Sequence, residues 1–566
     1  MLSGRLFFVF AFFALLGFGV ILRLFYLQIM QYREFSGIAA RQAQNGELAT
    51  PRRGAIYFQD KNGNLQAAAL NKNLYTLSAV PKDIQDPAIA AQELAPLMVL
   101  DEKIIREKLS RLNDTYEIIA RKVDDETALK IRLLGLRGIY LEIESRRIYP
   151  GGDLASHILG FVKFDNDKES GQYGIERFFQ RELAGEDGLW EGIDNSLSSI
   201  WMVSKRILNP PKDGKSVVLT IDYNIQRKAE EKLKFLMEKW KPENGSITIV
   251  DPMTGKILAL AASPAFDPNN YGKIADVGVF LNHVVESTYE LGSVMKPITM
   301  ASAINENAIK PDTTYVDSGE VRIKGYTIKN YDLKAHGKQT MTGVLEKSLN
   351  TGAVFAEQKL GNDKFLDYIK NFGFGEKTGI ELPGEVMGNI SNLKTGRDIE
   401  FATASFGQGI AVSPLQMIMA ESAVANGGNL MKPYIVEKIV DDSGAEQIFG
   451  PEVRRQVISK ETSETVSKML VSVTRQGFEN RAGVKGFFVA SKTGTAQVPN
   501  TNGRGYSADV IHSFMGYAPA FGPKFLIFIQ MNRPKGVNFA STSLSPTFHD
   551  LAEYILNYYE VPPDEK

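Results

Sequence analysis

The feature that most constrains this chain is an apolar run near its amino terminus. Seventeen residues from Leu6 to Leu22, LFFVFAFFALLGFGVIL, contain no charged or strongly polar side chain. A run of this length is sufficient to cross a lipid bilayer. A cleaved signal peptide would have a shorter apolar region and a small-residue cleavage site, whereas Arg23 and bulky side chains follow here. We therefore predict that residues 1–30 form a cytoplasmic stub and a retained transmembrane anchor.

The charges that flank this run predict its orientation. Arg5 and the amino terminus precede it, and positive charge tends to remain on the cytoplasmic side. No other stretch of the sequence is long and apolar enough to span a membrane. The chain is therefore predicted to pass once through the cytoplasmic (inner) membrane, with the residues after 30 extracytoplasmic (periplasmic). Arg23 either extends toward the outer interface or faces a partner helix.

Composition excludes several classes of function. The chain has 566 residues, 43% hydrophobic and 23% charged, which is enough material for several folded domains. Its 65 Lys and Arg residues balance 66 Asp and Glu residues, so no basic field exists to hold a nucleic acid. Cysteine is absent, and the five histidines form no metal-binding pair. We therefore expect no thiolate or His-rich metal site, and a nucleophile must be Ser, Thr, Lys or a carboxylate.

A change in composition divides the extracytoplasmic part. The segment Ile207 to Gly214, ILNPPKDG, contains two prolines and a glycine between patterned stretches. We place a boundary there, with a non-catalytic pedestal over residues 31–210 and a second domain over residues 215–562. The pedestal combines a predicted hairpin around Asp60-Lys-Asn-Gly63 with charged segments that are predicted to be helical, which indicates an elongated α+β domain. Its charge-rich stretch from Lys103 to Lys122 is predicted to be a solvated helical surface.

The second domain has strand-like runs toward both of its ends and a long, mainly helical segment between them. The strand-like runs are 217–221, 246–250, 256–261, 487–497, 512–518 and 525–531. Helical periodicity is present in 226–240 and 548–559. We predict an α+β fold in which helices cover the faces of a central antiparallel five-stranded sheet.

Ser293 and Lys296 form the first candidate catalytic pair. In Gly292-Ser293-Val-Met-Lys296 a lysine follows a serine by three residues at a helix start, so both side chains lie on one helix face. A lysine amine can take the proton of the hydroxyl if burial or a second cation lowers its pKa. The pattern alone is weak, because Ser391-Asn-Leu-Lys394 repeats it and a helix-capping serine is an alternative.

Two further motifs strengthen this pair. The one S-x-N sequence of the chain is Ser348-Leu-Asn350. K-T-G occurs at Lys377, Lys394 and Lys492, and only the third follows a strand-like run. A glycine on a strand permits close approach of a ligand, and a lysine with neighbouring hydroxyls suits a substrate carboxylate. Lys492 also supplies the second cation that the first pair requires.

With these three motifs in this order, the chain resembles the penicillin-recognising serine transferases, specifically the class B, monofunctional penicillin-binding proteins of cell-wall synthesis. Other similar segments are Arg53 to Ile56, Arg147 to Gly151, Tyr173 to Glu176, Phe374-Gly375, Thr378 to Gly384, Gly407 to Gly409 and Ser413 to Gln416. The chain is most similar to the septal, division-type branch, and the elongation branch is the near rival. The resemblance implies the penicillin-binding transpeptidase fold.

The resemblance also implies a peptidoglycan D,D-transpeptidase that β-lactams inhibit covalently. Ser293 would attack the D-alanyl-D-alanine bond of one stem peptide, and an amine of a neighbouring stem would resolve the acyl-enzyme. Lys296 would act as the base, Ser348 would relay a proton, and Asn350 would orient the substrate amide. Lys492 would provide the electrostatic field of the site. The resemblance implies that no metal and no organic cofactor is needed.

The remaining implied roles concern substrate binding and partners. Thr493 and Thr495, on either side of Gly494, would bind the terminal carboxylate. The backbone N–H groups of Ser293 and Thr495 would form the oxyanion hole. The implied partners are stem peptides, β-lactam antibiotics, the membrane, a multi-pass glycan polymerase and division-complex proteins, without nucleic acid.

Several alternatives share these motifs. A serine β-lactamase would turn over penicillin instead of retaining it, and a D,D-carboxypeptidase would pass the acyl group to water. An elongation-type transpeptidase would use the same chemistry at another place in the cell. A non-catalytic β-lactam-binding scaffold or sensor would retain its role after loss of Ser293.

Overall fold

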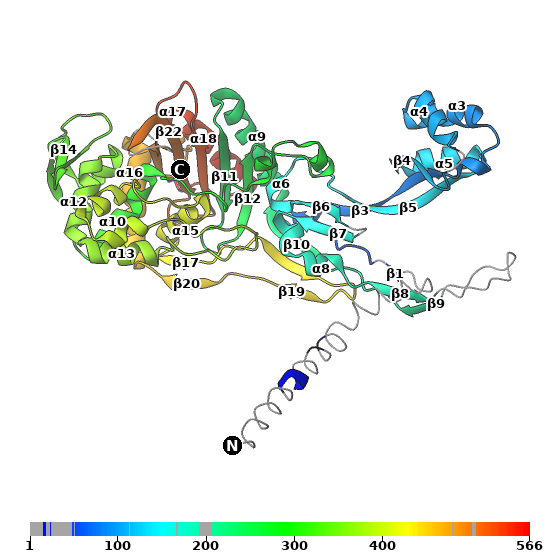
Figure 1. Cartoon of the computed structure of the whole chain (residues 1–566). Helices are drawn as coiled ribbons and strands as arrows, with labels where there is room; N and C mark the ends of the chain where they lie inside the picture. Colours follow the sequence, from blue (N-terminus) through cyan, green and yellow to red (C-terminus); the bar gives the residue numbers. More distant parts are fainter. Residues whose placement is uncertain are drawn as a thin grey trace, which may run out of the picture. The chain divides into compact units, whose positions relative to one another are not determined.

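The structure of the chain is a computed structural model (Figure 1). It describes residues 15–18, 23, 26, 48–49, 51–111, 114–165, 168–191, 206–477, 480–500 and 505–565. The predicted anchor over residues 1–30 lies almost wholly outside this set. Within the described residues, no helix has the length and apolarity required to cross a membrane.

The chain divides into two compact units. One consists of residues 1–54 and 181–215, and the other of residues 55–180 and 216–566. The division after residue 215 directly follows the Pro-Pro segment. Most of the predicted pedestal, residues 55–180, therefore belongs to the same compact unit as the second domain.

The smaller unit contains a three-stranded antiparallel sheet. Its order is β1 (Leu48–Ala49), β8 (Gly188–Glu191) and β9 (Arg206–Asn209). The segment after β9 is held by backbone hydrogen bonds, from Gly214 N to Arg52 O (2.8 Å) and from Lys215 N to Glu182 O (2.7 Å). The Pro-Pro segment is thus followed by residues with defined partners in this unit.

A second sheet in the larger unit has the order β19-β18-β10-β2-β3-β4, and β5 also pairs with β3. Its strands are β2 (Ile56–Gln59), β3 (Leu65–Ala79), β4 (Glu117–Val123), β5 (Ile139–Ile148), β10 (Ser216–Asp222), β18 (Val436–Val440) and β19 (Glu446–Ile448). The predicted strand 217–221 is β10, which pairs in parallel with β2 and antiparallel with β18. It therefore lies outside the five-stranded sheet.

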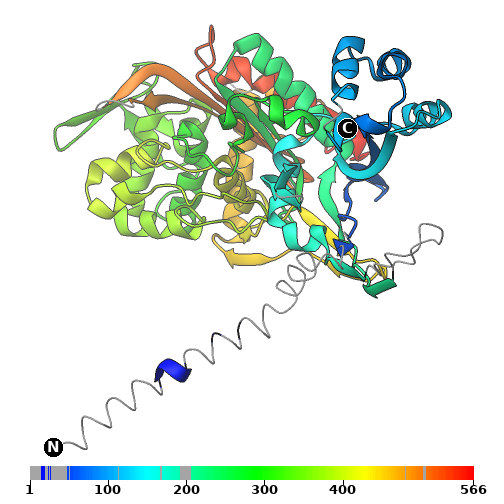
Figure 2. The same cartoon turned by 45° about the vertical axis from the view of Figure 1, so that its right-hand side comes forward.

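Three helices pack at the far end of β3, β4 and β5. They are α3 (Pro87–Met98), α4 (Glu102–Leu109) and α5 (Asp125–Leu133), and Figures 1 and 2 both show them gathered there. Buried Leu94, Ile105 and Ile131 form part of their core. The prediction of a helical surface up to Lys122 is wrong for its last part, because β4 pairs with β3 and Ile119 is buried there.

The central sheet of the larger unit has the order β12-β11-β23-β22-β21, and each neighbouring pair is antiparallel. Its strands are β11 (Asn244–Val250), β12 (Ile257–Ser263), β21 (Ala490–Pro499), β22 (Tyr506–Ala518) and β23 (Phe525–Asn532). They overlap the predicted strands 246–250, 256–261, 487–497, 512–518 and 525–531. Strands β11, β12 and β23 are buried along nearly their whole length, so both faces of the sheet are covered.

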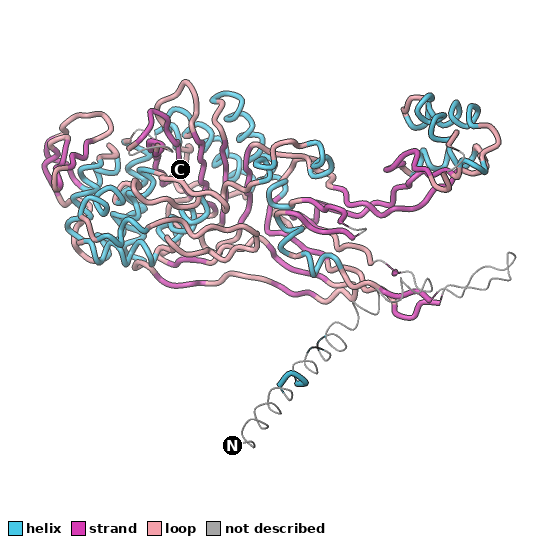
Figure 3. Tube along the Cα trace, in the orientation of Figure 1, coloured by secondary structure: helices cyan, strands magenta, loops and turns pink. Residues whose placement is uncertain are grey.

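Helices cover the two faces of this sheet (Figure 3). On one face lie α9 (Tyr223–Trp240) and α18 (Ser545–Tyr558), with the rings of Phe514 and Phe548 4.8 Å apart. On the other, the hydroxyl of Tyr517 in β22 lies 2.8 Å from Ser467 of α16 (Lys460–Gln476). Residues 514 and 517 point to opposite faces because side chains alternate along a strand.

The elements between β12 and β21 position the candidate site. Buried α15 (Pro414–Ala425) contacts the sheet, and α10 (Lys296–Asn305) packs against α15 and α16. The other helices of this region are α11 (Met341–Glu346), α12 (Asn350–Leu360), α13 (Asn362–Asn371) and α14 (Asp398–Ala404). The small strands are β13 (Thr314–Asp317), β14 (Glu320–Ile323), β15 (Tyr326–Lys329), β16 (Gly337–Thr340), β17 (Asn429–Met431) and β20 (Val453–Gln456).

The remaining elements precede β10 or follow β23. They are the strands β6 (Phe161–Asp165) and β7 (Lys168–Gln172), and the short helices α6 (Ser156–Leu159), α7 (Gly174–Phe178), α8 (Gln180–Ala184) and α17 (Ala540–Ser543).

A buried carboxyl in α12 makes stability depend on pH. Glu357 is 1% exposed, and burial, with a smaller contribution from Asp398, raises its pKa from 4.5 to about 7. The folded state thus disfavours the ionised carboxylate. The contribution of the protonated Glu357 carboxyl to the free energy of unfolding is therefore fully present below pH 4.5 and is lost as pH rises through 7. Glu357→Gln cannot ionise. Its stability relative to wild type should increase by on the order of 3 kcal/mol between about pH 4 and about pH 8.

Unfolding midpoints of both proteins across this pH range test the expectation. Glu553→Gln, at an exposed position of α18, is the control and should show no such increase. An equal difference between wild type and Glu357→Gln at both ends of the range would show that Glu357 does not titrate there.

Candidate active site

The nucleophile candidate lies in a short turn that leads into a buried helix. Residues Gly292–Met295 form a 3₁₀ turn, and α10 begins at Lys296. Ser293 is half-buried, whereas every other residue from Leu291 to Ala303 is buried. The fold therefore presents Ser293 at the edge of an otherwise enclosed segment.

Lys296 brings the first two motifs together. Its side chain is fully buried, and its Nζ atom donates to the carbonyl oxygen of Ser348 (2.6 Å), the hydroxyl of Ser348 (3.2 Å) and Oδ1 of Asn350 (2.9 Å). These contacts connect residues more than fifty positions apart in the sequence. The charged form of lysine has three N–H donors, so these three oxygens define the direction of the side chain. The neutral form has two N–H donors and a lone pair, so it donates to two of these oxygens and can accept a proton.

Ser348 has an unusual backbone conformation. Its φ of +53° lies in the left-handed region, which costs a residue with a side chain about 1–2 kcal/mol. The residue offers both its carbonyl and its hydroxyl to the Lys296 amine. Strain of this kind concentrates at functional sites, and here it accompanies two contacts to one atom.

Strand β21 places the third motif against the nucleophile turn. A Cβ atom on Gly494 would lie 2.5 Å from the carbonyl oxygen of Leu291, so this face of β21 touches the turn. The hydroxyl of Ser513, the partner of Gly494 on β22, donates to the same oxygen (2.7 Å). Lys492, two residues before Gly494, lies on the same strand face and is fully buried.

The threonines of the motif lie on the other face of β21. Thr493 is half-buried and Thr495 is exposed, and the hydroxyl of Thr495 accepts a hydrogen bond from Ala540 N (3.2 Å). A Cβ atom on Gly292 would lie 3.4 Å from the carbonyl carbon of Thr495, so the backbones of Ser293 and Thr495 are neighbours. Because β21 is at the edge of the sheet, alternate N–H groups of this strand do not face β22.

The repeated motifs lie elsewhere. Lys377 and Lys394 are exposed, and Ser391 is an exposed residue of the 3₁₀ turn Ser391–Thr395. The structure therefore brings Lys296, Ser348 and Asn350 together, next to the turn that contains Ser293 and the strand that carries Lys492, and it leaves the duplicates outside this arrangement.

Three supporting residues were not identified as such from the sequence. Ser513 holds Leu291, and the carbonyl of Gly407 accepts from Gly292 N (3.2 Å). Glu290 accepts from the hydroxyl of Tyr506 (2.9 Å), and burial raises the pKa of this carboxyl. Of these, only Gly407 had a signal, as part of the similar segment Gly407 to Gly409. Ser513 and Glu290 are single polar residues that belong to no motif in the sequence.

No group of three or more His, Asp or Glu side chains suitable for a metal ion occurs in the part of the chain that the structure describes. The site offers the hydroxyls of Ser293 and Ser348, two lysines, an amide and an edge strand.

The contact between β21 and the turn makes Gly494 sensitive to substitution. In Gly494→Ala, the added methyl group would meet Leu291 O and the Ser513 hydroxyl. The turn or the strand must then shift. A displacement of about 1 Å can cost about 10²-fold in rate, so we expect acylation of Ser293 by penicillin to slow by about that factor.

Gly450→Ala is the matched control, because nothing lies within 4 Å of a Cβ atom at Gly450. Acylation time courses of the two variants and wild type give the comparison. Wild-type rates for Gly494→Ala would contradict the close approach of β21 to the turn.

Two family models match the chain. The penicillin binding protein transpeptidase domain matches residues 245–553, and the penicillin-binding protein dimerisation domain matches residues 48–219. The first contains all three motifs.

Curated relatives are similar over most of their length. Stage V sporulation protein D of Bacillus subtilis is 34% identical over 531 residues, which cover 93% of this chain and 81% of that protein. Penicillin-binding protein PbpB of Mycolicibacterium smegmatis is 30% identical and covers 95% and 88%. Peptidoglycan D,D-transpeptidase FtsI of Escherichia coli is 29% identical and covers 89% and 84%.

Solved structures show the same fold. Penicillin binding protein 2X from Streptococcus thermophilus has a TM-score of 0.78 at 23% identity, covering 90% of this chain and 80% of that one. Penicillin binding protein 3 from Mycobacterium tuberculosis, complexed with ampicillin, has a TM-score of 0.70 at 26% identity and covers 92% and 98%.

Proposed function

The chain belongs to the penicillin-binding protein transpeptidase family, and on this basis we propose that it is a peptidoglycan D,D-transpeptidase of the class B, monofunctional type. It cross-links stem peptides of the cell wall through a serine acyl-enzyme, and β-lactams inhibit it covalently. The observation that carries this proposal is the triple contact of the Lys296 amine with Ser348 and Asn350, next to the strand of Gly494.

We assign the acylation step to Ser293 and Lys296. The Ser293 hydroxyl attacks the carbonyl carbon of the D-alanyl-D-alanine bond while the neutral Lys296 amine takes its proton. The C–N bond then breaks, and the departing D-alanine receives a proton that Ser348 relays from Lys296. Backbone N–H groups of Ser293 and Thr495 stabilise the oxyanion.

The other site residues bind and orient the peptide. Asn350 orients the substrate amide, and Lys492 provides a positive field on the face of β21 that touches the turn. Thr493 and Thr495, which flank Gly494, bind the terminal carboxylate. An amine of a second stem peptide then attacks the acyl-enzyme and leaves a cross-link, which restores Ser293.

Location and partners follow from the anchor and the resemblance. The apolar run Leu6 to Leu22 supports a single-pass protein of the cytoplasmic membrane with its catalytic domain outside. In that place it would act with a multi-pass glycan polymerase and division-complex proteins. The similarity to FtsI supports a septal role, and depletion should then block division before it affects cell width.

Mass spectrometry of the full-length protein tests the function. After incubation with a penicillin, the intact mass should increase by one penicilloyl group, and peptide mapping should place it on Ser293. A synthetic peptide ending in D-alanyl-D-alanine, with an amine acceptor, should give the cross-linked product. Rapid loss of the adduct would indicate a β-lactamase, and a hydrolysed peptide without cross-link would indicate a carboxypeptidase.

A further inference from the structure

Helix α12, which begins at Asn350, has no capping side chain of its own. The residue before it, Leu349, makes no side-chain hydrogen bond to the helix. Instead Asn330, twenty residues earlier, receives hydrogen bonds at Oδ1 from Asn350 N (3.0 Å) and Thr351 N (3.3 Å). The first N–H groups of a helix require such partners. Asn330 therefore caps α12 from a different part of the chain.

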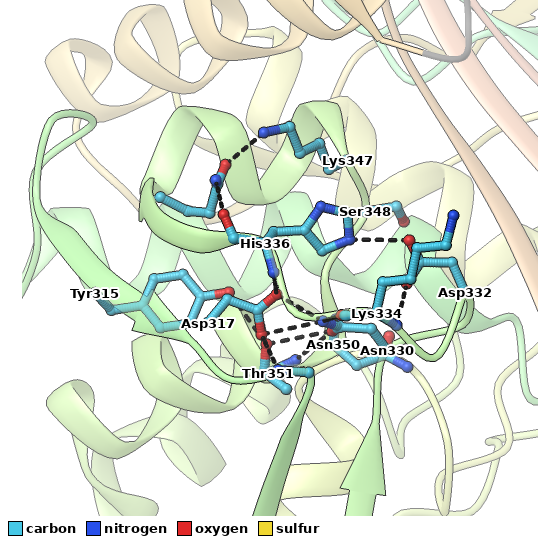
Figure 4. A network of polar contacts seen from close by, with 12 residues as sticks. Tyr315, Asp317, Asn330, Asp332, Lys334, His336, Lys347, Ser348, Asn350 and Thr351 are labelled. Carbon is cyan, nitrogen blue, oxygen red and sulfur yellow. Dashed lines mark hydrogen bonds and ion pairs between the residues drawn. The ribbon is translucent and has the colours of Figure 1, made fainter.

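Asp317 determines which way the Asn330 amide points. Nδ2 of Asn330 donates to both carboxylate oxygens of Asp317 (3.1 and 2.9 Å) and to Lys334 O (3.2 Å), as Figure 4 shows. A carboxylate only accepts, so it selects the NH₂ end of the amide. The oxygen of Asn330 is then directed at α12.

The environment of Asp317 favours its ionised form. Asp317 is 2% exposed, and burial alone would raise its pKa. Hydrogen bonds from Gly319 N (3.0 Å), the Thr351 hydroxyl (2.8 Å) and His336 N (3.0 Å) outweigh this and lower the pKa. A buried carboxylate with this many donors is an acceptor whose position is strongly defined.

The same segment also holds the side chain of Asn350. Its Nδ2 donates to the carbonyl of Lys329 (2.9 Å), and its Oδ1 accepts from the Lys296 amine (2.9 Å). Neighbouring residues 329 and 330 thus bind both the amide and the backbone of Asn350. A chain of direct contacts connects Asp317 through Asn330 and Asn350 to Lys296.

We propose that Asp317 and Asn330 are positioning residues for acylation: through the start of α12 they orient Asn350, which holds the Lys296 amine. The inference rests on the proposed function, because it assigns Lys296 the role of base. Neither residue contacts the reacting atoms in this account. Their contribution is to the geometry of the base.

Asp317→Asn is the most direct test, since it keeps the shape and can present an NH₂ group to the NH₂ group of Asn330. In the full-length protein, the first-order constant for acylation by a fluorescent penicillin should fall by about 10²-fold. The concentration of penicillin that gives half of the maximal acylation rate should change much less, because the substitution does not alter the substrate-binding strand β21. If the contacts served only stability, the Tm would fall while folded molecules reacted at the wild-type rate, and this outcome would overturn the proposal.

Exchanging the two side chains, Asp317 and Asn330, tests whether the orientation of the side chain at position 330 matters. The double variant Asp317→Asn/Asn330→Asp again places one carboxylate opposite one amide and leaves acceptor oxygens for α12, but it loses the hydrogen bond to Lys334 O. It should recover part of the lost acylation rate, about tenfold. Asp398→Asn, which disturbs another Asn–Asp pair (Asn362 Nδ2 to Asp398 Oδ1, 3.0 Å), is the control and should acylate normally.

If Asp317→Asn does not fold, Thr351→Val decides. It removes one donor to Asp317 and should slow acylation by about tenfold, whereas Thr351→Ser keeps the hydroxyl and should not. Equal rates in Val and Ser variants would overturn the inference. Absence of a Ser293 adduct in wild type would instead refute the proposed function, so the two failures are distinguishable.

Discussion

Replacement of Ser293 with alanine is expected to reduce covalent labelling by penicillin to background. The Ser293 hydroxyl is the only atom in our mechanism that forms the bond to the carbonyl carbon. Lys296, Ser348 and Asn350 would remain in place, but they have no group to activate. Removal of a catalytic nucleophile typically costs about 10⁶-fold in rate. Intact mass after incubation with a penicillin, together with formation of cross-linked peptide, measures the effect.

The chain supplies a matched control for this variant. Ser391 is the serine of the second S-x-x-K sequence, and it is exposed. Ser391→Ala should label and cross-link as wild type does. An adduct on any residue of Ser293→Ala would show that the nucleophile lies elsewhere, and normal growth on that variant alone would favour the scaffold alternative.

Replacement of Lys296 with methionine should produce the second largest effect. Methionine fills a similar volume in this fully buried position but cannot take a proton. General base catalysis typically contributes 10²–10⁴-fold, so acylation should slow by about that range. The oxygens of Ser348 and Asn350 also lose their common donor, which should disturb the start of α12. Stopped-flow or quenched acylation assays give the rate constant directly.

Substitutions of two other lysines distinguish the role of general base from that of a positive electrostatic field. Lys394→Met, in the second S-x-x-K sequence, should have no effect because Lys394 is exposed. Lys492→Met should raise the half-saturating concentration of penicillin more than Lys296→Met does, since the positive field that we assign to Lys492 attracts the carboxylate of the ligand. Wild-type acylation by folded Lys296→Met would exclude Lys296 as the base.

Family membership and the main folding pattern could be predicted from the sequence. Strand-like runs, the helices around 226–240 and 548–559, and the three motifs were all identifiable because they depend on neighbours within a few positions. The transpeptidase assignment is confirmed by the family matches. The individual roles of the site residues stay predictions, although the structure brings Lys296 and the S-x-N motif together.

Other features could not be predicted in this way. The run 217–221 had the right composition for a strand, but composition does not say which sheet it joins, and β10 pairs with β2 and β18. Charge in the stretch up to Lys122 indicated a solvated helix, whereas pairing with β3 makes its end a strand. In both cases the pairing partner, not local propensity, decided the outcome.

The sequence by itself determined the chemical groups of this protein and their local spacing: a serine one helical turn from a lysine, a single S-x-N, three K-T-G sequences and an apolar run. Helical spacing alone places Ser293 and Lys296 on one face. Only the tertiary structure decided which K-T-G lies beside Ser293, and that Asn330 and Asp317 hold Asn350. Those contacts join residues up to about two hundred positions apart, so they depend on strand order and register. Order and register are set by the summed free energy of burying many apolar side chains, which no local stretch of sequence shows.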